Sequence, residues 1–380
     1  MQNLWKIHAA AAFGLEASVK RECEELGFQG IHVEEGHVIF EGGPHEVALA
    51  NIALRTADRV LLELGRFPAK TFEELYENIK RLAWKDFLPR EAAFPIRARS
   101  VRSVLKSETD LQKIGKKAIV DAVNGRKNGA WLPENGALYP VLLTLRHDEC
   151  IVCLDTTGEG LFKRGYREEK GSAPIKETLA AALVDLSVWN PRRTLADVFC
   201  GSGTILIEAA RKARGMDPGL DRSFLSMKWD IIGEKVYAQV RRDRMQRISF
   251  DTQLELLGFD IDPKVISIAR ANAEAAGVGE DIHFMKRDMR EIFFKENFGV
   301  MITNPPYGKR IGEIRETRAL MQAFSERFFK LRTWSIYVIS AFEDWETLVG
   351  NVADRRRKLY NGGIKATYYE YLGPNPERFK

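Results

Sequence analysis

The chain has 380 residues, of which 45% are hydrophobic and 29% are charged, and its formal net charge is +5. This composition is typical of a soluble, folded protein, and the length suits two or three domains rather than one. Since no apolar run is long enough to cross a bilayer and no signal peptide is recognisable, we expect a cytoplasmic protein without a membrane partner. The mildly basic charge permits a polyanionic partner, and the composition does not predict an oligomeric state.

The first 157 residues alternate short helices and strands without a glycine-rich phosphate loop. Apolar spacing predicts helices at residues 15–26, 46–54, 72–82 and 110–123, and strands at residues 38–40, 60–64, 94–101, 141–145 and 151–154. The last two strands form a predicted hairpin that carries Cys150 and Cys153. Because no second ligand pair accompanies this C-x-x-C, we expect two reduced thiols rather than a metal site or a redox site.

The pattern changes after a glycine-rich stretch between residues 158 and 171. Strands are predicted at residues 195–199, 254–259, 282–285, 300–303 and 336–340, with helical stretches between most of them. This alternation is typical of an α/β fold with a doubly wound sheet. Two basic runs, at residues 241–244 and 355–358, are interpreted as solvated faces.

A glycine turn follows the first strand of this second part. Gly201 and Gly203 lie between a strand that ends at Phe199 and a helix that begins near Thr204. Glycines allow a tight turn and a close approach of a ligand to the backbone, next to the free N–H groups of a helix N-terminus. A dinucleotide fingerprint requires a third glycine where Leu206 stands, so a dinucleotide is disfavoured.

Acidic residues follow the next two strands. Asp260 ends the second strand, where a carboxylate commonly holds a ribose diol, although residues 216–253 lengthen its spacing from the glycine turn. Asp262 precedes Pro263 and is expected to cap a helix. Asp288 follows the third strand, where its carboxylate could accept a hydrogen bond from an adenine amine.

The sequence Asn304-Pro305-Pro306-Tyr307 directly follows the apolar strand at residues 300–303. The two prolines stiffen the turn and hold Asn304 extended. The Asn304 side-chain oxygen and the Pro305 carbonyl can then both accept from an exocyclic amine, which directs the nitrogen lone pair toward an electrophile. Tyr307 can stack on the base.

These four elements, in this order, resemble the class I methyltransferases of the Asn-Pro-Pro-Tyr amino group. Residues 172–179, 217–229 and 358–364 are similar to segments of the bacterial THUMP-domain RNA guanine-N2 methyltransferases, which are relatives of the N-terminal half of the large-subunit rRNA methyltransferase. The resemblance covers nearly the whole chain. It implies a C-terminal Rossmann-like doubly wound methyltransferase sheet preceded by an α+β ferredoxin-like and THUMP region.

The resemblance also implies domain boundaries, a cofactor and site residues. We expect a ferredoxin-like segment at 1–66, a THUMP RNA-binding domain at 67–157, a linker at 158–172 and a methyltransferase domain at 173–380. The expected catalytic residues are Asn304, Pro305, Pro306 and Tyr307. Expected to bind S-adenosyl-L-methionine are Asp197, Phe199, Gly201, Ser202, Gly203, Thr204, Asp260, Ile261, Asp288, Met289 and Asn304. Expected to bind RNA are Arg97, Arg99, Lys113, Lys116, Lys117, Lys309 and Arg310, and no metal is expected.

The predicted activity is methylation of the exocyclic N2 amine of a guanine, in 23S rRNA. A guanine of tRNA is the alternative substrate, and a DNA adenine-N6 methyltransferase would use the same Asn-Pro-Pro-Tyr, although the N-terminal half argues against DNA. A non-catalytic RNA-binding protein or ribosome assembly factor is the alternative of another class. Methylation of a ring carbon through a cysteine is disfavoured, because only Cys200 lies in this part of the chain and it sits on the glycine turn.

Overall fold

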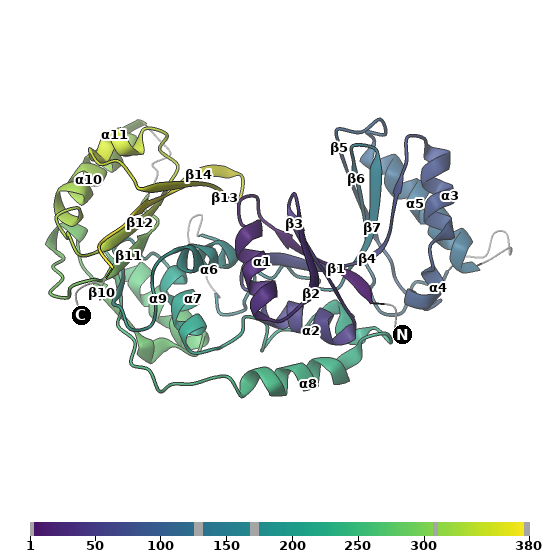
Figure 1. The fold of residues 1–380 in the computed structure, drawn as a ribbon, viewed down its shortest axis with the longest axis horizontal. Helices are drawn as coiled ribbons and strands as arrows, with labels where there is room; N and C mark the ends of the chain where they lie inside the picture. Colours follow the sequence, from purple (N-terminus) through teal and green to yellow (C-terminus); the bar gives the residue numbers. More distant parts are fainter. Residues whose placement is uncertain (1–3, 125–131, 168–174, 307–310, 376–380) are drawn as a thin grey trace. The chain divides into compact units, whose positions relative to one another are not determined.

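The computed structural model describes residues 4–124, 132–167, 175–306 and 311–375 (Figure 1). Two compact units make up the chain. The first consists of Met1–Ala11, Lys20–Leu161 and Arg222–Asp243, and the second of Ala12–Val19, Phe162–Asp221 and Arg244–Lys380. None of the helices in these ranges is long and apolar enough to cross a membrane.

The first unit is built on a seven-stranded sheet in the order β2-β3-β1-β4-β7-β6-β5. Its strands are β1 (Trp5–Ala11), β2 (Gln29–Glu34), β3 (His37–Gly42), β4 (Ala57–Pro68), β5 (Ile96–Val101), β6 (Val141–Arg146) and β7 (Glu149–Asp155). The helices are α2 (Pro44–Ala53), α3 (Phe72–Arg81), α4 (Trp84–Phe87) and α5 (Glu108–Asn124), while α1 (Glu16–Glu25) spans the division between the units. The long strand β4 pairs with β1 on one side and β7 on the other, so one continuous sheet runs through this unit.

A segment from the middle of the chain completes this first unit. The short helix η1 (Leu225–Lys228) and most of α8 (Gly233–Met245) belong to it. The buried Trp229 stacks on Tyr139 with 4.5 Å between the ring centroids, and its Nε1 donates to the Leu138 carbonyl. The segment at 216–253, which separates the glycine turn from Asp260 in the sequence, therefore packs in part with the N-terminal sheet.

The second unit contains the doubly wound sheet that the sequence predicts, in the order β10-β9-β8-β11-β12-β14-β13. Strands β8 to β12 run parallel, and β14 is antiparallel to β12. The strands are β8 (Leu195–Asp197), β9 (Leu256–Asp260), β10 (Ile282–Lys286), β11 (Val300–Thr303), β12 (Ser335–Ser340), β13 (Arg355–Asn361) and β14 (Ile364–Tyr371). The helices are α6 (Glu177–Leu186), α7 (Thr204–Ala213), α9 (Pro263–Ala275), α10 (Ile311–Phe328) and α11 (Trp345–Val349), with the short η2 (Gly279–Asp281) and η3 (Met289–Glu291).

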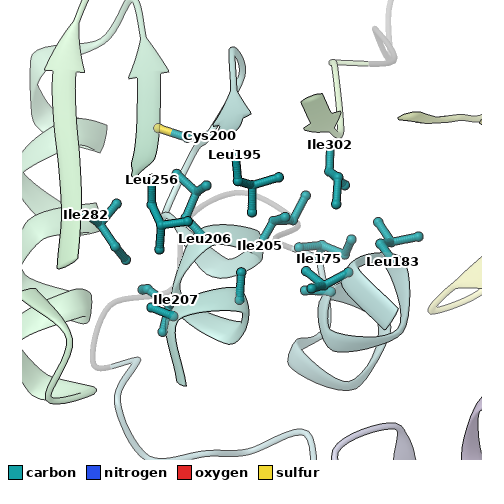
Figure 2. Packing of buried hydrophobic residues seen from close by; sticks show 14 of the residues in the cluster. Ile175, Leu183, Leu195, Cys200, Ile205, Leu206, Ile207, Leu256, Ile282 and Ile302 are labelled. Carbon is teal, nitrogen blue, oxygen red and sulfur yellow. The ribbon is translucent and has the colours of Figure 1, made fainter. Parts of the chain in front are cut away.

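Two hydrophobic layers cover the faces of this second sheet. On one face α6, α7 and α9 pack against residues such as Leu195, Leu256 and Ile302 (Figure 2). On the other face α10 and α11 pack against the alternate strand positions, among them Met301. The alternation follows from the pleat of a strand, which sends successive side chains to opposite faces. Burial on both faces explains why the strands read as continuous apolar runs.

The structure corrects the sequence prediction at several strands. It contains β1, β2, β13 and β14, none of which was predicted. The basic run at residues 355–358 lies on β13, which is an edge strand, and Arg356 and Arg357 pair with Glu346 and Glu370. Because charged side chains are common on the exposed face of an edge strand, they hid the strand pattern there. The run is nevertheless a largely exposed face, as expected.

Candidate methyltransferase site

The predicted cofactor residues gather at one edge of the second sheet. They follow β8, β9, β10 and β11, which are neighbouring parallel strands. Since the carboxyl ends of parallel strands meet at the same edge, residues 197–204, 260–261, 288–289 and 304 lie together there, at the usual ligand position in such sheets. The sequence alone predicted these four strands, and their order in the sheet brings the residues together.

The two glycines of the turn have different tasks. Gly201 and Gly203 have φ angles of +52° and +80°, which other residues rarely adopt. A Cβ on Gly203 would come within 2.7 Å of the Phe284 ring, so this position is needed for packing. A Cβ on Gly201 would meet no atom within 4 Å, so the turn faces open space there and leaves room for a ligand.

Asp260 is held beside this turn. Its Oδ2 accepts a hydrogen bond from the Gly201 N–H at 3.1 Å, and its Oδ1 accepts from the Asp262 N–H at 3.0 Å. The next side chain, Ile261, is 62% exposed at the end of the strand, where it offers an apolar surface to a flat ring. Asp262 caps α9 by accepting from the Lys264 N–H, and Pro263 follows at the first helical position, which confirms the predicted cap.

Asp197 is buried, unlike Asp260. Its Oδ1 accepts from the Thr303 hydroxyl at 2.6 Å and from the Phe199 N–H at 3.1 Å. Burial, with a smaller contribution from the nearby Asp260 carboxylate, raises the pKa of Asp197 to about 7, against the lowering effect of these two hydrogen bonds. The Asp197 carboxylate thus ties the end of β8 to the end of β11, directly before Asn304.

Asp288 and Met289 lie at the end of β10. Asp288 caps η3 and forms a two-oxygen ion pair with Arg290, which lowers the pKa of its carboxyl. Met289 is 3% exposed and belongs to the hydrophobic layer under α10. An adenine amine bound here would have to share the Asp288 carboxylate with Arg290.

The predicted catalytic loop begins at the end of β11, beside the glycine turn. Residues 300 and 301 of β11 pair with residues 195 and 196 of β8. Asn304 is half-buried, Pro305 is buried and Pro306 is exposed. Tyr307, Lys309 and Arg310 lie outside the described residues.

The predicted RNA-binding residues of the first unit lie on two opposite faces. Arg97 and Arg99 are exposed on β5. The opposite set of β5 side chains includes Ile96, which faces α5 near Gly115. Since successive residues of a strand alternate between faces, Arg97 and Arg99 point away from that helix. In Figure 1, α3 and α5 cover only one face of β5, β6 and β7.

The α5 lysines already have partners within the protein. Lys116 forms an ion pair with Glu134 at 2.6 Å and lies 3.5 Å from the centre of the Phe94 ring. Lys117 lies over the Tyr76 ring, and the well-exposed Lys113 makes a long ion pair with Asp110. The structure therefore separates the five basic residues of this unit that the sequence grouped together.

The cysteines take no visible part in chemistry. Cys150 and Cys153 lie on β7 of the predicted hairpin with β6, and all four cysteines are free and buried. Burial raises the pKa of Cys150 to about 12 and that of Cys153 still higher, so both thiols stay protonated and unreactive. Among the described residues no group of side chains is arranged to hold a metal ion.

The sequence did not predict a buried polar cluster that lies against the first turns of α7, the helix that follows the glycine turn. It consists of Arg164, Tyr166, Arg167, Glu177 and Glu208, and each of these side chains is largely or wholly buried. The first three fall in the segment interpreted as a linker, where glycines and charges indicated a solvated loop. Glu177 lies at residues 172–179, a segment that resembles the methyltransferase family. This resemblance was the one feature of the sequence that pointed to the cluster.

Three family models match consecutive parts of the chain. Residues 6–61 match an RlmL ferredoxin-like domain, residues 69–155 match a THUMP domain, and residues 164–370 match the model described as RMKL-like, methyltransferase domain. The last match covers more than half of the chain. The fold and these matches define a THUMP-containing class I methyltransferase, and the chain belongs to the RMKL-like methyltransferase family.

Proteins of nearly equal length are similar to this chain. YpsC of Bacillus subtilis (strain 168), whose name proposes an RNA methyltransferase, is 42% identical over 98% of this chain and 97% of its own. A Listeria monocytogenes structure, described as a predicted N6-adenine-specific DNA methylase, is 42% identical with a TM-score of 0.92, covering 98% of this chain and 97% of its own. SMU.472, crystallised with SAH, is 38% identical with a TM-score of 0.92, covering 99% of this chain and all of its own.

Proposed function

We propose that the chain transfers a methyl group from S-adenosyl-L-methionine to the exocyclic N2 amine of a guanine in structured RNA, and that 23S rRNA is the substrate. Membership of the methyltransferase family and the ferredoxin-like and THUMP matches support an RNA methyltransferase. The name of the YpsC relative points the same way, and the relative SMU.472 binds the product form of this cofactor. A guanine of tRNA is the alternative substrate.

Several residues at the carboxyl ends of these strands suit this cofactor. Gly201 leaves space beside the N-terminus of α7, Asp260 presents a carboxylate to a ribose diol, and Ile261 offers an apolar face to the adenine. Asp288 would accept from the adenine amine while it keeps Arg290. When bound, the cofactor supplies a methyl group made electrophilic by a positively charged sulfur, so the task of the protein is mainly positioning.

Asn304 is the residue that carries the proposal. Its side-chain oxygen and the Pro305 carbonyl would accept the two amine hydrogens and turn the nitrogen lone pair toward the methyl group of the cofactor. The Asp197–Thr303 hydrogen bond holds the base of this loop against the strand that leads into the glycine turn. Tyr307 is proposed to stack on the base, which must first leave its helix to reach the pocket.

The test of this role is single-turnover methylation by an Asn304→Ala variant. Positive charge develops on the amine nitrogen as it is methylated, so an acceptor beside it acts most strongly in the transition state. We expect a rate loss of about 10²–10³, comparable to the loss of one preorganised hydrogen-bonding group, and a much smaller effect on cofactor affinity.

Asn297→Ala is the matched control. Asn297 is an exposed asparagine that lies just before the first residue of β11, at the end of the strand away from Asn304. It should methylate at the normal rate. A folded Asn304→Ala variant that also retains the normal single-turnover rate would contradict the proposed role, and with it the choice of an exocyclic amine. A protein that binds RNA and the cofactor but transfers no methyl group would favour the non-catalytic alternative.

A further inference from the structure

A buried cluster of charged side chains lies next to the first turns of α7, within the second unit. The Arg164 and Glu208 side chains are each 1% exposed and lie 3.5 Å apart, and the Tyr166 hydroxyl donates to Glu208 at 2.9 Å. Arg167 pairs with Glu177 at 3.4 Å. Burying charges is costly unless they are paired, and the charges of this cluster are paired with one another.

Arg167 is the member of the cluster that reaches the glycine turn. Its Nη2 donates to the Thr204 Oγ1 at 2.6 Å and to the Ile175 carbonyl at 3.1 Å. Thr204 is the first residue of α7, and its Oγ1 lies 3.1 Å from the Ser202 Oγ. One guanidinium therefore contacts the residue at which the turn becomes the helix.

The backbone before Arg167 is shaped for this contact. Gly165 has a φ angle of +95°, and Arg164 and Tyr166 on either side of it both reach Glu208. Glu208 and Thr204 are four residues apart on α7, so they lie on the same face of the helix. Residues 164–167 thus contact two successive turns of α7 along one face.

We propose that Arg167 is a positioning residue for the cofactor site, and that it acts through its hydrogen bond to Thr204. The bond fixes residues 202–204, whose backbone must keep one geometry to receive the cofactor beside Gly201. Glu177 balances the guanidinium charge, which would otherwise stand at the positive end of the α7 dipole. This inference rests on the proposed cofactor site.

The first test is the affinity of the full-length Arg167→Met variant for S-adenosylhomocysteine, measured by calorimetry. A charged hydrogen bond to a neutral group contributes enough for a ten- to hundredfold loss, so we expect affinity to fall by about tenfold or more. The KM for S-adenosyl-L-methionine should rise by the same factor, while kcat at saturation changes by less than about threefold. Hydrogen exchange should accelerate in residues 200–207.

The matched control is Arg211→Met. Arg211 is a buried arginine on α7 itself, and it donates to the carbonyls of Asp217 and Ala276, away from the turn. Its loss should lower the melting temperature and leave the cofactor affinity within about twofold of normal. Equal losses of affinity in both variants would mean that Arg167 has only a general structural role, which overturns the proposal.

A double-variant cycle tests whether Arg167 acts through Thr204. Thr204→Val removes the acceptor, so adding Arg167→Met should weaken cofactor binding no further. Fully additive losses would contradict the mechanism. Should Arg167→Met fail to fold, Arg167→Lys serves instead. One ammonium cannot keep all three contacts, so the affinity of the Arg167→Lys variant for S-adenosylhomocysteine should fall below that of the wild type. Normal affinity would refute the proposal.

The outcomes separate this inference from the proposed function. Wild-type protein that binds no S-adenosylhomocysteine would refute the cofactor site and this inference together. Normal binding by a folded Arg167→Met variant, with unchanged hydrogen exchange at the turn, would refute only the role of Arg167.

Discussion

Asp197 connects two parts of the site through one oxygen atom. Its Oδ1 accepts both from Thr303, which precedes the catalytic loop, and from the Phe199 N–H of the glycine turn. The carboxyl is 2% exposed, and its pKa of about 7 means that it holds a proton in the folded protein at mildly acidic pH. The sequence predicts a cofactor contact at Asp197, and its own contacts add a role in holding the two loops together.

This raised pKa predicts a specific dependence of stability on pH. Between about pH 4 and pH 7 the unfolded chain has released this proton and the folded chain has kept it, so the free energy of unfolding falls as pH rises and levels off above the folded pKa. Asp197→Asn keeps an Oδ1 for both hydrogen bonds and lacks this titration. Its stability relative to the wild type should therefore increase by about 1–3 kcal/mol from pH 5 to pH 8.

The measurement is urea unfolding of both proteins at several pH values across this range. Parallel curves, with a constant difference between the two proteins, would show that Asp197 does not titrate there. Asp288→Asn is the contrasting variant. Arg290 lowers the pKa of the Asp288 carboxyl, so the stability that this pair contributes is already complete over the same range and is lost only in more acidic solution.

The roles of polar residues at strand ends were predictable, because a residue's type and its position after a strand limit what it can bind or cap. Asp262 is the helix cap that the sequence indicated, and Asp260 lies at the turn. Arg167 was not predictable, since its role depends on contacts with Thr204, 37 residues away, and the charged, glycine-rich sequence around it looks like a loop. The pairing of Asp288 with Arg290 was equally invisible without the local geometry.

At the scale of elements, β5 and α5 present their basic residues to opposite sides of the first sheet. The sequence could place Arg97 and Arg99 on one strand and the three lysines on one helix, but not the face that each element shows. The lysines have protein partners, while no ion pair of Arg97 or Arg99 is found among the described residues. Strand β5 is also the edge of the sheet. We therefore propose that the RNA surface lies on the open face of β5.

Reversal of charge on each face tests this assignment. Arg97→Glu/Arg99→Glu should weaken RNA binding at least about tenfold and reduce the slope of log affinity against log salt by about 2, because two phosphate contacts no longer release counterions. Lys113→Glu/Lys117→Glu changes the net charge equally and serves as the control. Filter binding over a range of salt concentrations distinguishes them, and a larger effect of the lysine pair would move the surface to α5.

At the scale of the whole molecule, the sequence predicted two parts, but not that each unit is built from more than one segment of the chain. The regular alternation of strands and helices after residue 171 predicted the doubly wound sheet, and the apolar runs located the parallel strands β8 to β12. The chain then returns to the first unit at Arg222–Asp243, where Trp229 stacks on Tyr139. Such long-range packing leaves no periodic signal. We therefore propose domains at 1–66, 67–157 and 173–380 joined by a linker at 158–172, with two amendments. Residues 162–167 are assigned to the second unit, where they pack against α7, and the returning segment Arg222–Asp243 is assigned to the first.

The central claim, methylation of an exocyclic guanine amine of RNA, is tested most directly by identifying the methylated nucleoside. Three reactions each contain the protein, labelled S-adenosyl-L-methionine and one nucleic acid: unmodified 23S rRNA, tRNA or duplex DNA. Each product is digested and analysed by mass spectrometry. We predict N2-methylguanosine from 23S rRNA and no label in DNA. The same nucleoside from tRNA alone would correct the substrate, whereas N6-methyladenine in DNA, or a methyl group on a ring carbon or a ribose oxygen, would contradict the claim.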